Sequence, residues 1–199
     1  MFEALPEQVS VPLVFSVLLH DIGKPPTYSY DPVDQRIRFS GHDKVGAEMT
    51  ERIMERLRFP RKEIDAAVEA VACHMIFKDV QDMRVSRLKR FMSRDHFEDE
   101  LELHRVDCTS SHGDLSNYVF LQEKQEEFAH EPLIPEPLMT GRDLIALGFK
   151  PGPRFKEILD AVQSRQLEGT LHDHDQAVAW VSQEFSPEAP PMSSGASHP

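Results

Sequence analysis

Apolar residues recur at helical spacing along most of the chain. On either side of Pro60 they form two stripes with a period near 3.6, which predicts two amphipathic helices. The first stripe is Val45, Met49, Ile53 and Leu57, and the second is Ile64, Ala67 or Val68, Val71 and Met75. We expect both stripes to face the core.

The same periodicity predicts helices over about 84–93, 96–111 and 115–129, with a break at Gly113. Three shorter helical segments follow within 140–148, 151–162 and 174–185. The strand-like pattern is confined to IRF at 37–39. The predicted fold class is therefore all-α.

Proline and serine content divides the chain. EPLIPEPL, at 131–138, has three prolines in eight residues and is typical of a linker. SPEAPPMSSGASHP at the end has no periodicity, which indicates disorder. We expect one domain over 1–130, a linker over 131–139, a small helical module over 140–186 and a disordered tail over 187–199.

The oily run 11–19 ends in a polar pair, His20 and Asp21. The run is apolar almost all round, so it predicts a central, fully buried helix that Gly23 and Pro25 terminate. The carbonyl end of a helix carries partial negative charge and favours a cation. A metal ion there would neutralise an aspartate placed against the core.

Three further polar residues fall on inward helix faces by their spacing: His42, His74 and Asp107. For a single histidine the alternative is a core imidazole bonded to a backbone carbonyl. For the set, packing alone is a poor explanation, since each unpaired buried group costs about 1 to 3 kcal/mol. Imidazoles and carboxylates together suit Fe, Mn, Zn, Ni or Mg. Near Asp107, His104 and His112 would line the same cavity.

Composition narrows the function classes. The chain has 199 residues, 40% of them hydrophobic, and a net charge of -12, which argues against indiscriminate nucleic-acid binding. One stretch, MRVSRLKRFMSR, is locally basic and is either a polyanion contact or a solvated face balanced by neighbouring acids. Its cations are Arg84, Arg87, Lys89, Arg90 and Arg94. Two cysteines, no export signal and no membrane-length apolar run predict a cytoplasmic protein with no membrane partner.

Four segments in order, LLHDIGKP, GHDKVGA, CHM and HRVDCTSSHG, resemble the HD-domain metal-dependent phosphohydrolases. The wording is closest to the HD region of bacterial CCA-adding tRNA nucleotidyltransferases and related poly(A) polymerases. MTGRDLIALGFKPGPRFKEIL and QLEGTL resemble the tail of those enzymes. The resemblance covers roughly 10–185 and implies an HD-domain helical bundle with a small C-terminal helical tail module.

The resemblance implies roles for individual residues. His20, Asp21 and Asp107 match the ligands of a first divalent metal, and His42 and His74 match those of a second, with Asp21 able to bridge. Lys24 matches a lysine that lies beside the substrate phosphate, although a solvated lysine is the alternative. Either Lys24 or His112 would touch the phosphate.

Two features of the family pattern are missing. HD domains supply another histidine ahead of the doublet, and 1–19 contain none, so the first metal would lack a ligand. A nucleotidyltransferase head is also absent, since Asp173 and Asp175 follow no Gly-Ser turn or strand. We therefore expect a fragment of a longer enzyme that does not add nucleotides by itself. Its truncated face could support a homodimer.

The leading hypothesis is the HD and tail portion of a CCA-adding-type enzyme, with phosphomonoesterase or 2',3'-cyclic phosphodiesterase activity. Its partners would be tRNA or another phosphate ester. The alternative is a non-catalytic tRNA-binding body with a degenerate metal site, in which the basic stretch grips RNA. A dNTP triphosphohydrolase shares the HD core, but the tail motif argues against it.

Overall fold

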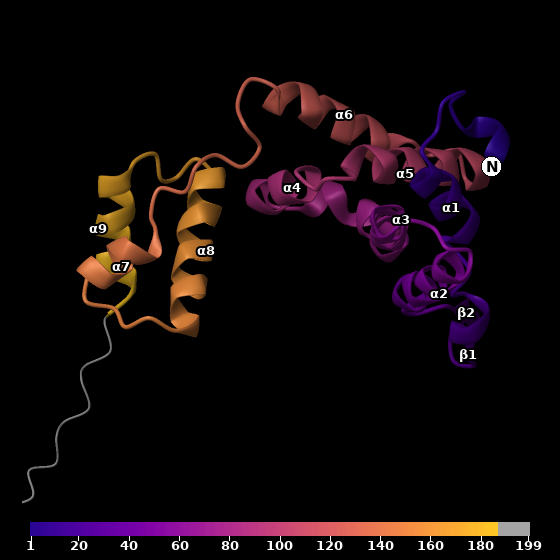
Figure 1. Ribbon diagram of the computed structural model, residues 1–199, viewed down its shortest axis with the longest axis horizontal. Coiled ribbons are helices and arrows are strands. Elements are labelled where there is room, and N and C mark those ends of the chain that lie inside the picture. The colour runs from indigo at the N-terminus through magenta and orange to yellow at the C-terminus, as the bar shows by residue number, and fades with distance from the viewer. Residues whose placement is uncertain (187–199) are drawn as a thin grey trace, which may run out of the picture. The chain divides into compact units, whose positions relative to one another are not determined.

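The computed structural model describes residues 1–186, which form two compact units. The first unit contains Met1–Met83 and Phe91–His130, and the second contains Arg84–Arg90 and the described residues from Glu131 onward. Within the described residues the secondary structure consists of helices and one two-stranded sheet (Figure 1). The predicted all-α class is confirmed.

Five α-helices lie wholly in the first unit. Their bounds are α1 Val11–Leu19, α2 His42–Arg56, α3 Arg61–Cys73, α5 Phe97–Ser111 and α6 Ser116–Phe128. Short 3-10 segments cover Phe2–Ala4, Pro25–Thr27 and His74–Asp82. Met75 thus lies beyond the end of α3 and is partly exposed, contrary to its predicted place on the inward stripe.

Helix α1 packs against α3 and α5 through one face only. Ser10 caps its N-terminus by accepting a hydrogen bond from the Leu13 backbone N–H at 3.1 Å. Leu13 and Val17 are buried against apolar side chains of α3 and α5. Leu18, however, is 57% exposed, so the prediction of a fully buried central helix is wrong. The apolar run reads as buried all round because Leu and Val also occupy the open face.

Helix α2 presents a different face to the core from the one its larger side chains predict. Its buried residues are His42, Gly46, Ala47, Thr50 and Met54. The predicted stripe lies at the edge of this face: Val45, Met49 and Ile53 are only partly buried, and Leu57 is 52% exposed. A side chain at Gly46 would press on Val71 of α3, so small residues let α2 and α3 approach closely.

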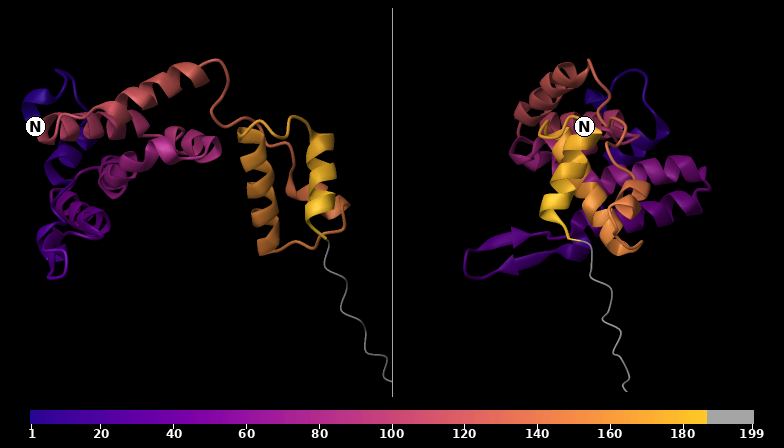
Figure 2. Two further views of the ribbon diagram at one scale, coloured as in Figure 1. Left: turned by 180° about the vertical axis from the view of Figure 1, so that it is seen from behind. Right: turned by 90° about the vertical axis from the view of Figure 1, so that its left-hand side faces the viewer.

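A small antiparallel hairpin separates α1 from α2. β1 (Ser29–Asp31) pairs with β2 (Arg36–Arg38) in the register Ser29 to Arg38, Tyr30 to Ile37 and Asp31 to Arg36. The pair projects from the helices of its unit (Figure 2). β2 overlaps the predicted strand-like segment, and β1 was not predicted.

The remaining core of the first unit is aromatic and contains one buried ion pair. Phe77, Phe91 and Phe97 pack together with ring centroids 5.0 to 6.3 Å apart; Phe77 and Phe97 are stacked, and Phe91 meets both edge-on. Beside them Arg94 pairs with Glu100, whose side chain is 0% exposed. The Arg94 guanidinium also lies 4.2 Å from the centre of the Phe91 ring.

The second unit contains α7 (Gly141–Ala146), α8 (Pro153–Leu167), α9 (His174–Glu184) and most of α4 (Val85–Met92). A capping box between Thr140 and Asp143 starts α7. Asp173 caps α9 by accepting from the Gln176 N–H at 2.8 Å, so its spacing from Asp175 reflects a helix start. The core is apolar and comprises Met139, Leu144, Phe149, Ile158, Val162, Leu171, Ala177 and Val181.

The contact division falls at His130, the predicted end of the first domain, but it also assigns Arg84–Arg90 to the second unit. Met139, in the predicted linker, is buried in the second unit's core. None of the helices within residues 1–186 is long and apolar enough to cross a membrane. The predicted disordered tail, 187–199, lies outside the described residues.

Candidate metal centre

The His20-Asp21 pair sits where α1 ends and the chain turns toward α2. His20 caps α1, and its N–H donates to the Ser16 carbonyl. The turn brings Gly23 against the first turn of α2, where any Cβ at position 23 would overlap the His42 carbonyl oxygen. Glycine is therefore required for the close approach that places Asp21 beside His42.

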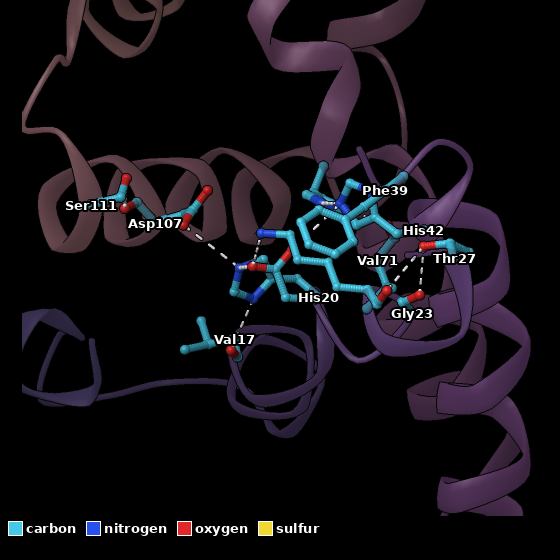
Figure 3. Close-up of polar contacts among 12 residues, drawn as sticks. Val17, His20, Gly23, Thr27, Phe39, His42, Val71, Asp107 and Ser111 are labelled. Atoms are coloured by element: carbon cyan, nitrogen blue, oxygen red, sulfur yellow. Dashed lines mark hydrogen bonds and ion pairs between the residues drawn. The ribbon is translucent and has the colours of Figure 1, made fainter. Parts of the chain in front are cut away.

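Three imidazoles are held in the same way (Figure 3). The Nδ1 atom of each lies within hydrogen-bonding distance of the carbonyl three residues earlier in the chain. The distances are 3.1 Å for His20 to Val17, 2.8 Å for His42 to Phe39 and 2.6 Å for His74 to Val71. A carbonyl oxygen only accepts, so each Nδ1 carries the hydrogen. In the neutral ring this leaves the lone pair on Nε2.

The Nε2 atoms of His42 and His74 then face each other, and that of His20 lies beside the two aspartates. His42 Nε2 and His74 Nε2 are 3.2 Å apart, and the His20 and His74 rings lie 5.4 Å apart between centroids. All three residues are buried, at 6 to 9% exposure. Two bare nitrogens at 3.2 Å repel each other unless a proton or a cation bridges them, so the arrangement favours a bound cation.

Two carboxylates complete the cluster. Asp21 extends one oxygen to 3.4 Å from His20 Nε2 and the other to 3.4 Å from His42 Nε2. Asp107, on α5, lies 3.6 Å from His20 Nε2. Both aspartate side chains are 39% exposed, so the acids face the opening of the site while the imidazoles form its buried wall.

The electrostatics divide the histidines into two kinds. Burial alone would lower the pKa of His20, but its pairing with Asp107 and Asp21 outweighs burial and raises this pKa to about 9. Burial and the positive charge of neighbouring histidines lower the pKa of His74. Pairing with His20 keeps the pKa of Asp107 below its usual range. Burial by itself would raise the pKa of Asp21, but His20 and Lys24 hold this pKa well below the ordinary value.

The donor set fits a divalent metal. Ligand atoms of Asp21, His42 and His74 all lie within 4.8 Å of one another, which marks a His/Asp metal site. Nε2 lone pairs with Nδ1–H fixed by carbonyl acceptors are the usual state of metal-binding histidines. His20 and Asp107 adjoin the three. The structure thus brings together all five residues predicted as ligands.

Lys24 lies beside the cluster. Its ammonium is 2.6 Å from Asp21 Oδ2 and 5.9 Å from the centre of the Phe39 ring, and its side chain is 40% exposed. It can therefore meet an anion that approaches Asp21 from solvent.

The other two candidates on α5 have different surroundings. His112 is exposed, and its Nδ1 accepts the backbone N–H of Asp114 at 3.1 Å, so its described contact is with its own loop. His104 stacks on Phe77 with centroids 4.8 Å apart, and burial lowers its pKa. His104 is better explained as part of the aromatic core.

The predicted basic stretch is not one open surface. Arg84 and Arg87 are exposed. Arg90 hydrogen-bonds to Ser164 Oγ at 3.1 Å within the second unit, and Arg94 is paired with buried Glu100. Lys89 is partly buried. Arg90 and Arg94 are therefore engaged in intramolecular contacts.

Sequence reasoning missed the backbone groups that orient the histidines. The carbonyls of Val17, Phe39 and Val71 each precede their histidine by three residues. Every histidine has a carbonyl three residues earlier in the chain. That carbonyl can accept from the ring only where a helix begins or ends at the histidine, and the sequence does not fix such boundaries to the residue. Gly23, in contrast, could have been recognised, since an HDxG turn against a second helix requires a small residue.

Comparison with known proteins gives a consistent result. The model of the HD domain family matches residues 7–111. The A-adding tRNA nucleotidyltransferase of Deinococcus radiodurans is 33% identical over 186 residues, 89% of this chain and 42% of that protein. The CC-adding tRNA nucleotidyltransferase of Thermus thermophilus is 32% identical over 169 residues, 83% of this chain and 38% of that protein.

A multifunctional CCA protein of Halorhodospira halophila is 41% identical over a shorter stretch of 61 residues, 31% of this chain and 14% of that protein. The chain thus spans about two fifths of the length of the first two relatives. No solved structure matches the chain.

Proposed function

The chain belongs to the HD domain family, and from this premise we propose that it is a metal-dependent phosphohydrolase acting on phosphomonoesters or 2',3'-cyclic phosphodiesters. It would be the HD and tail portion of a CCA-adding-type protein, since two relatives that align with more than four fifths of this chain are tRNA nucleotidyltransferases. Nucleotide addition is not part of the proposal.

One observation carries it: the Nε2 atoms of His42 and His74 lie 3.2 Å apart, and the Asp21 carboxylate lies between His20 and His42. Without a bridging proton or cation, two lone pairs would be opposed at that distance in a buried place. His42, His74 and Asp21 would hold the cation, with His20 and Asp107 at its side. A divalent metal there would polarise a phosphate and lower the pKa of a bound water.

The residues around that position have separate tasks. The three backbone carbonyls fix the imidazoles, so little rearrangement is needed on binding. Lys24 attracts the phosphate and opposes the negative charge of Asp21. His20 is protonated at neutral pH in the metal-free protein, because its pKa is about 9, and its Nε2–H lies between two carboxylates. That proton must leave if His20 is to become a ligand, so metal affinity rises with pH.

The test is metal analysis of the purified protein, followed by hydrolysis assays on p-nitrophenyl phosphate and 2',3'-cyclic AMP. Asp21→Asn should lower metal affinity and kcat/KM by about 100-fold or more, since even partners outside the ligand shell cost 10 to 100-fold. The matched control is Asp82→Asn, an exposed aspartate of the same unit, which should leave both unchanged. A protein that binds no divalent metal and hydrolyses neither substrate contradicts the proposal.

A second candidate is a tRNA-binding body without catalysis. It is favoured by the names of the two relatives that cover most of this chain, since both are tRNA nucleotidyltransferases. Exposed Arg84 and Arg87 are the cations available for it. Alanine at both should weaken tRNA binding and reduce its salt dependence by about two phosphate contacts, measured by titration at several salt concentrations. Retained tRNA binding in a metal-free, inert protein would favour this candidate over the first.

A further inference from the structure

The β1-β2 hairpin has two unlike faces. Side chains alternate between the faces of a strand, so paired Tyr30 and Ile37 share one face. The rings of Tyr28 and Phe39 meet at its base with centroids 6.1 Å apart. We call these four residues the aromatic face. The opposite face carries Asp31, which is partly buried and is paired at 3.9 Å with exposed Arg38.

The aromatic face is open. Tyr28 is 57% exposed, and Tyr30 and Ile37 are 54% exposed each. A two-stranded hairpin has no second layer to cover such a face. Its tip is nevertheless ordered, because Asp31 accepts the Val33 N–H at 2.9 Å and Asp34 accepts the Arg36 N–H at 3.0 Å. The face is therefore an exposed, largely apolar surface on a hairpin with a hydrogen-bonded tip.

The aromatic face is continuous with the candidate metal centre. Only the 3-10 segment Pro25–Thr27 and Tyr28 separate Lys24 from β1, and β2 ends at Arg38, shortly before His42 begins α2. Phe39 contributes its carbonyl to His42 Nδ1 and its ring to the aromatic face. Lys24 bridges the two, with its ammonium 2.6 Å from Asp21 Oδ2 and 5.9 Å from the Phe39 ring (Figure 3). A ligand whose anionic end meets Lys24 would extend its other end along the aromatic face.

We propose that the aromatic face is a stacking surface for the planar base of a nucleoside phosphate whose phosphate lies at the metal centre. This rests on the proposed phosphohydrolase function and adds the residues that read the part of the substrate beyond the phosphate. Tyr28 and Tyr30 supply rings, Ile37 supplies a flat aliphatic neighbour, and Lys24 marks the border between the base and the phosphate.

The chemistry of the face selects this occupant. The surface consists of a single layer of side chains on two short strands. Its small area suits a flat ring better than the longer apolar face of an amphipathic helix. The cation at one end complements a phosphate. Arg38, on the opposite face, does not compete for the phosphate, because it is paired with Asp34 and Asp31. A sequence-tolerant stacking contact is typical of nucleotide-binding surfaces.

The test compares two ligands that differ only in the base, adenosine 5'-monophosphate and ribose 5-phosphate, by calorimetric titration of the full chain with Mn²⁺ present. Stacking should make the nucleotide bind about tenfold more tightly. Tyr30→Ser should reduce that ratio to about threefold or less, and Tyr30→Phe should keep it. Arg36→Ser, on the opposite face, is the matched control and should also keep it. Circular dichroism of each variant checks the fold.

Equal affinities for the two ligands in the unchanged protein would overturn the proposal, as would a Tyr30→Ser variant that keeps the ratio. The same holds if Tyr30→Ser converts an oligomer to a monomer and leaves the ratio unchanged, because the face would then bind another copy. Hydrolysis is scored separately. A nucleotide preference without hydrolysis supports the stacking surface and contradicts the phosphohydrolase, and hydrolysis without a preference does the reverse.

Discussion

The two units of the chain differ in what their helices enclose. The second unit encloses an unbroken apolar core, with Leu144, Ile158 and Val181 fully buried. The first also has apolar clusters, but where α1, α2, α3 and α5 meet it buries three imidazoles, and near Phe91 it buries an ion pair. A core that contains polar groups depends on their partners, whereas an apolar core depends on packing alone. The first unit thus gives up stability where it gains chemistry.

The comparison can be tested because the units carry different reporters. Trp180 is the chain's single tryptophan, and it lies in the second unit against Phe185 at 5.6 Å. Tryptophan fluorescence therefore follows the second unit, and far-ultraviolet circular dichroism follows both. Denaturant titrations read by the two signals assign a change to one unit or the other.

The largest effect is expected from Arg94→Ala. It leaves Glu100 buried and unpaired, which costs about 3 to 5 kcal/mol of unfolding free energy. The circular dichroism transition should move to lower denaturant while the fluorescence transition stays in place. Arg87→Ala, at an exposed arginine, should change neither. Replacing both Arg94 and Glu100 by leucine should recover most of the loss, and equal shifts in both signals would show that the units unfold together.

Ile158→Ala should have the next largest effect, in the other unit. Ile158 is 0% exposed, and truncation of such a residue costs about 2 to 5 kcal/mol. Here the fluorescence transition should move. The matched control is Ile145→Ala on α7, since Ile145 is 54% exposed and should cost little. An unchanged fluorescence midpoint in the Ile158 variant would contradict the packing described for this core.

Metal addition should stabilise the first unit alone. A metal-free sample given Mn²⁺ at 100 times its dissociation constant should gain about 2.7 kcal/mol. The gain should be seen by circular dichroism and should vanish in Asp21→Asn. Chelation should reverse it. If the fluorescence transition shifted and the circular dichroism transition did not, the metal would be bound by the second unit, which would contradict the assignment of the site to the first.

The smallest effect concerns pH and the second unit. Pairing with Asp143, at 3.3 Å from His174 Nε2, raises the pKa of His174. A raised pKa in the folded state means that the stabilisation is fully present below the unfolded value of 6.5 and is lost as pH rises through the folded value. The fluorescence midpoint should therefore fall slightly between about pH 6 and about pH 9. His174→Gln should flatten this trend, and His172→Gln should not.

The sequence predicted helices well and helix faces less well. Two neighbouring rows of side chains run along α2, and the larger apolar residues predicted that the row of Val45, Met49 and Ile53 faces the core. The buried row is instead that of His42, Gly46, Thr50 and Met54, because the small residue at 46 allows closer contact between α2 and α3. Side-chain size therefore led to the wrong inward face for α2, although the prediction that His42 is buried was correct.

The residues of the candidate site could be named from the sequence for two reasons. Their spacing puts them on inward helix faces, and the segments that contain them follow one another in the order typical of HD domains. The arginines were less predictable, since a basic run looks the same whether its members face solvent or reach a buried acid. Arg94 and Glu100 lie six residues apart in the chain, and no helical spacing signals their contact. The hairpin was missed for a similar reason: β1 is three residues long and acquires its meaning from its partner strand.

The register of that hairpin has one more consequence. Ser29 and Arg38 face each other across its base, so the chain departs and comes back at nearly the same point. Everything between them can be exchanged, lengthened or shortened without moving Asp21 or His42. The fold thus separates the candidate metal centre from an adjacent ribbon whose sequence can change independently, and exchange of that ribbon is a route to new ligand preferences.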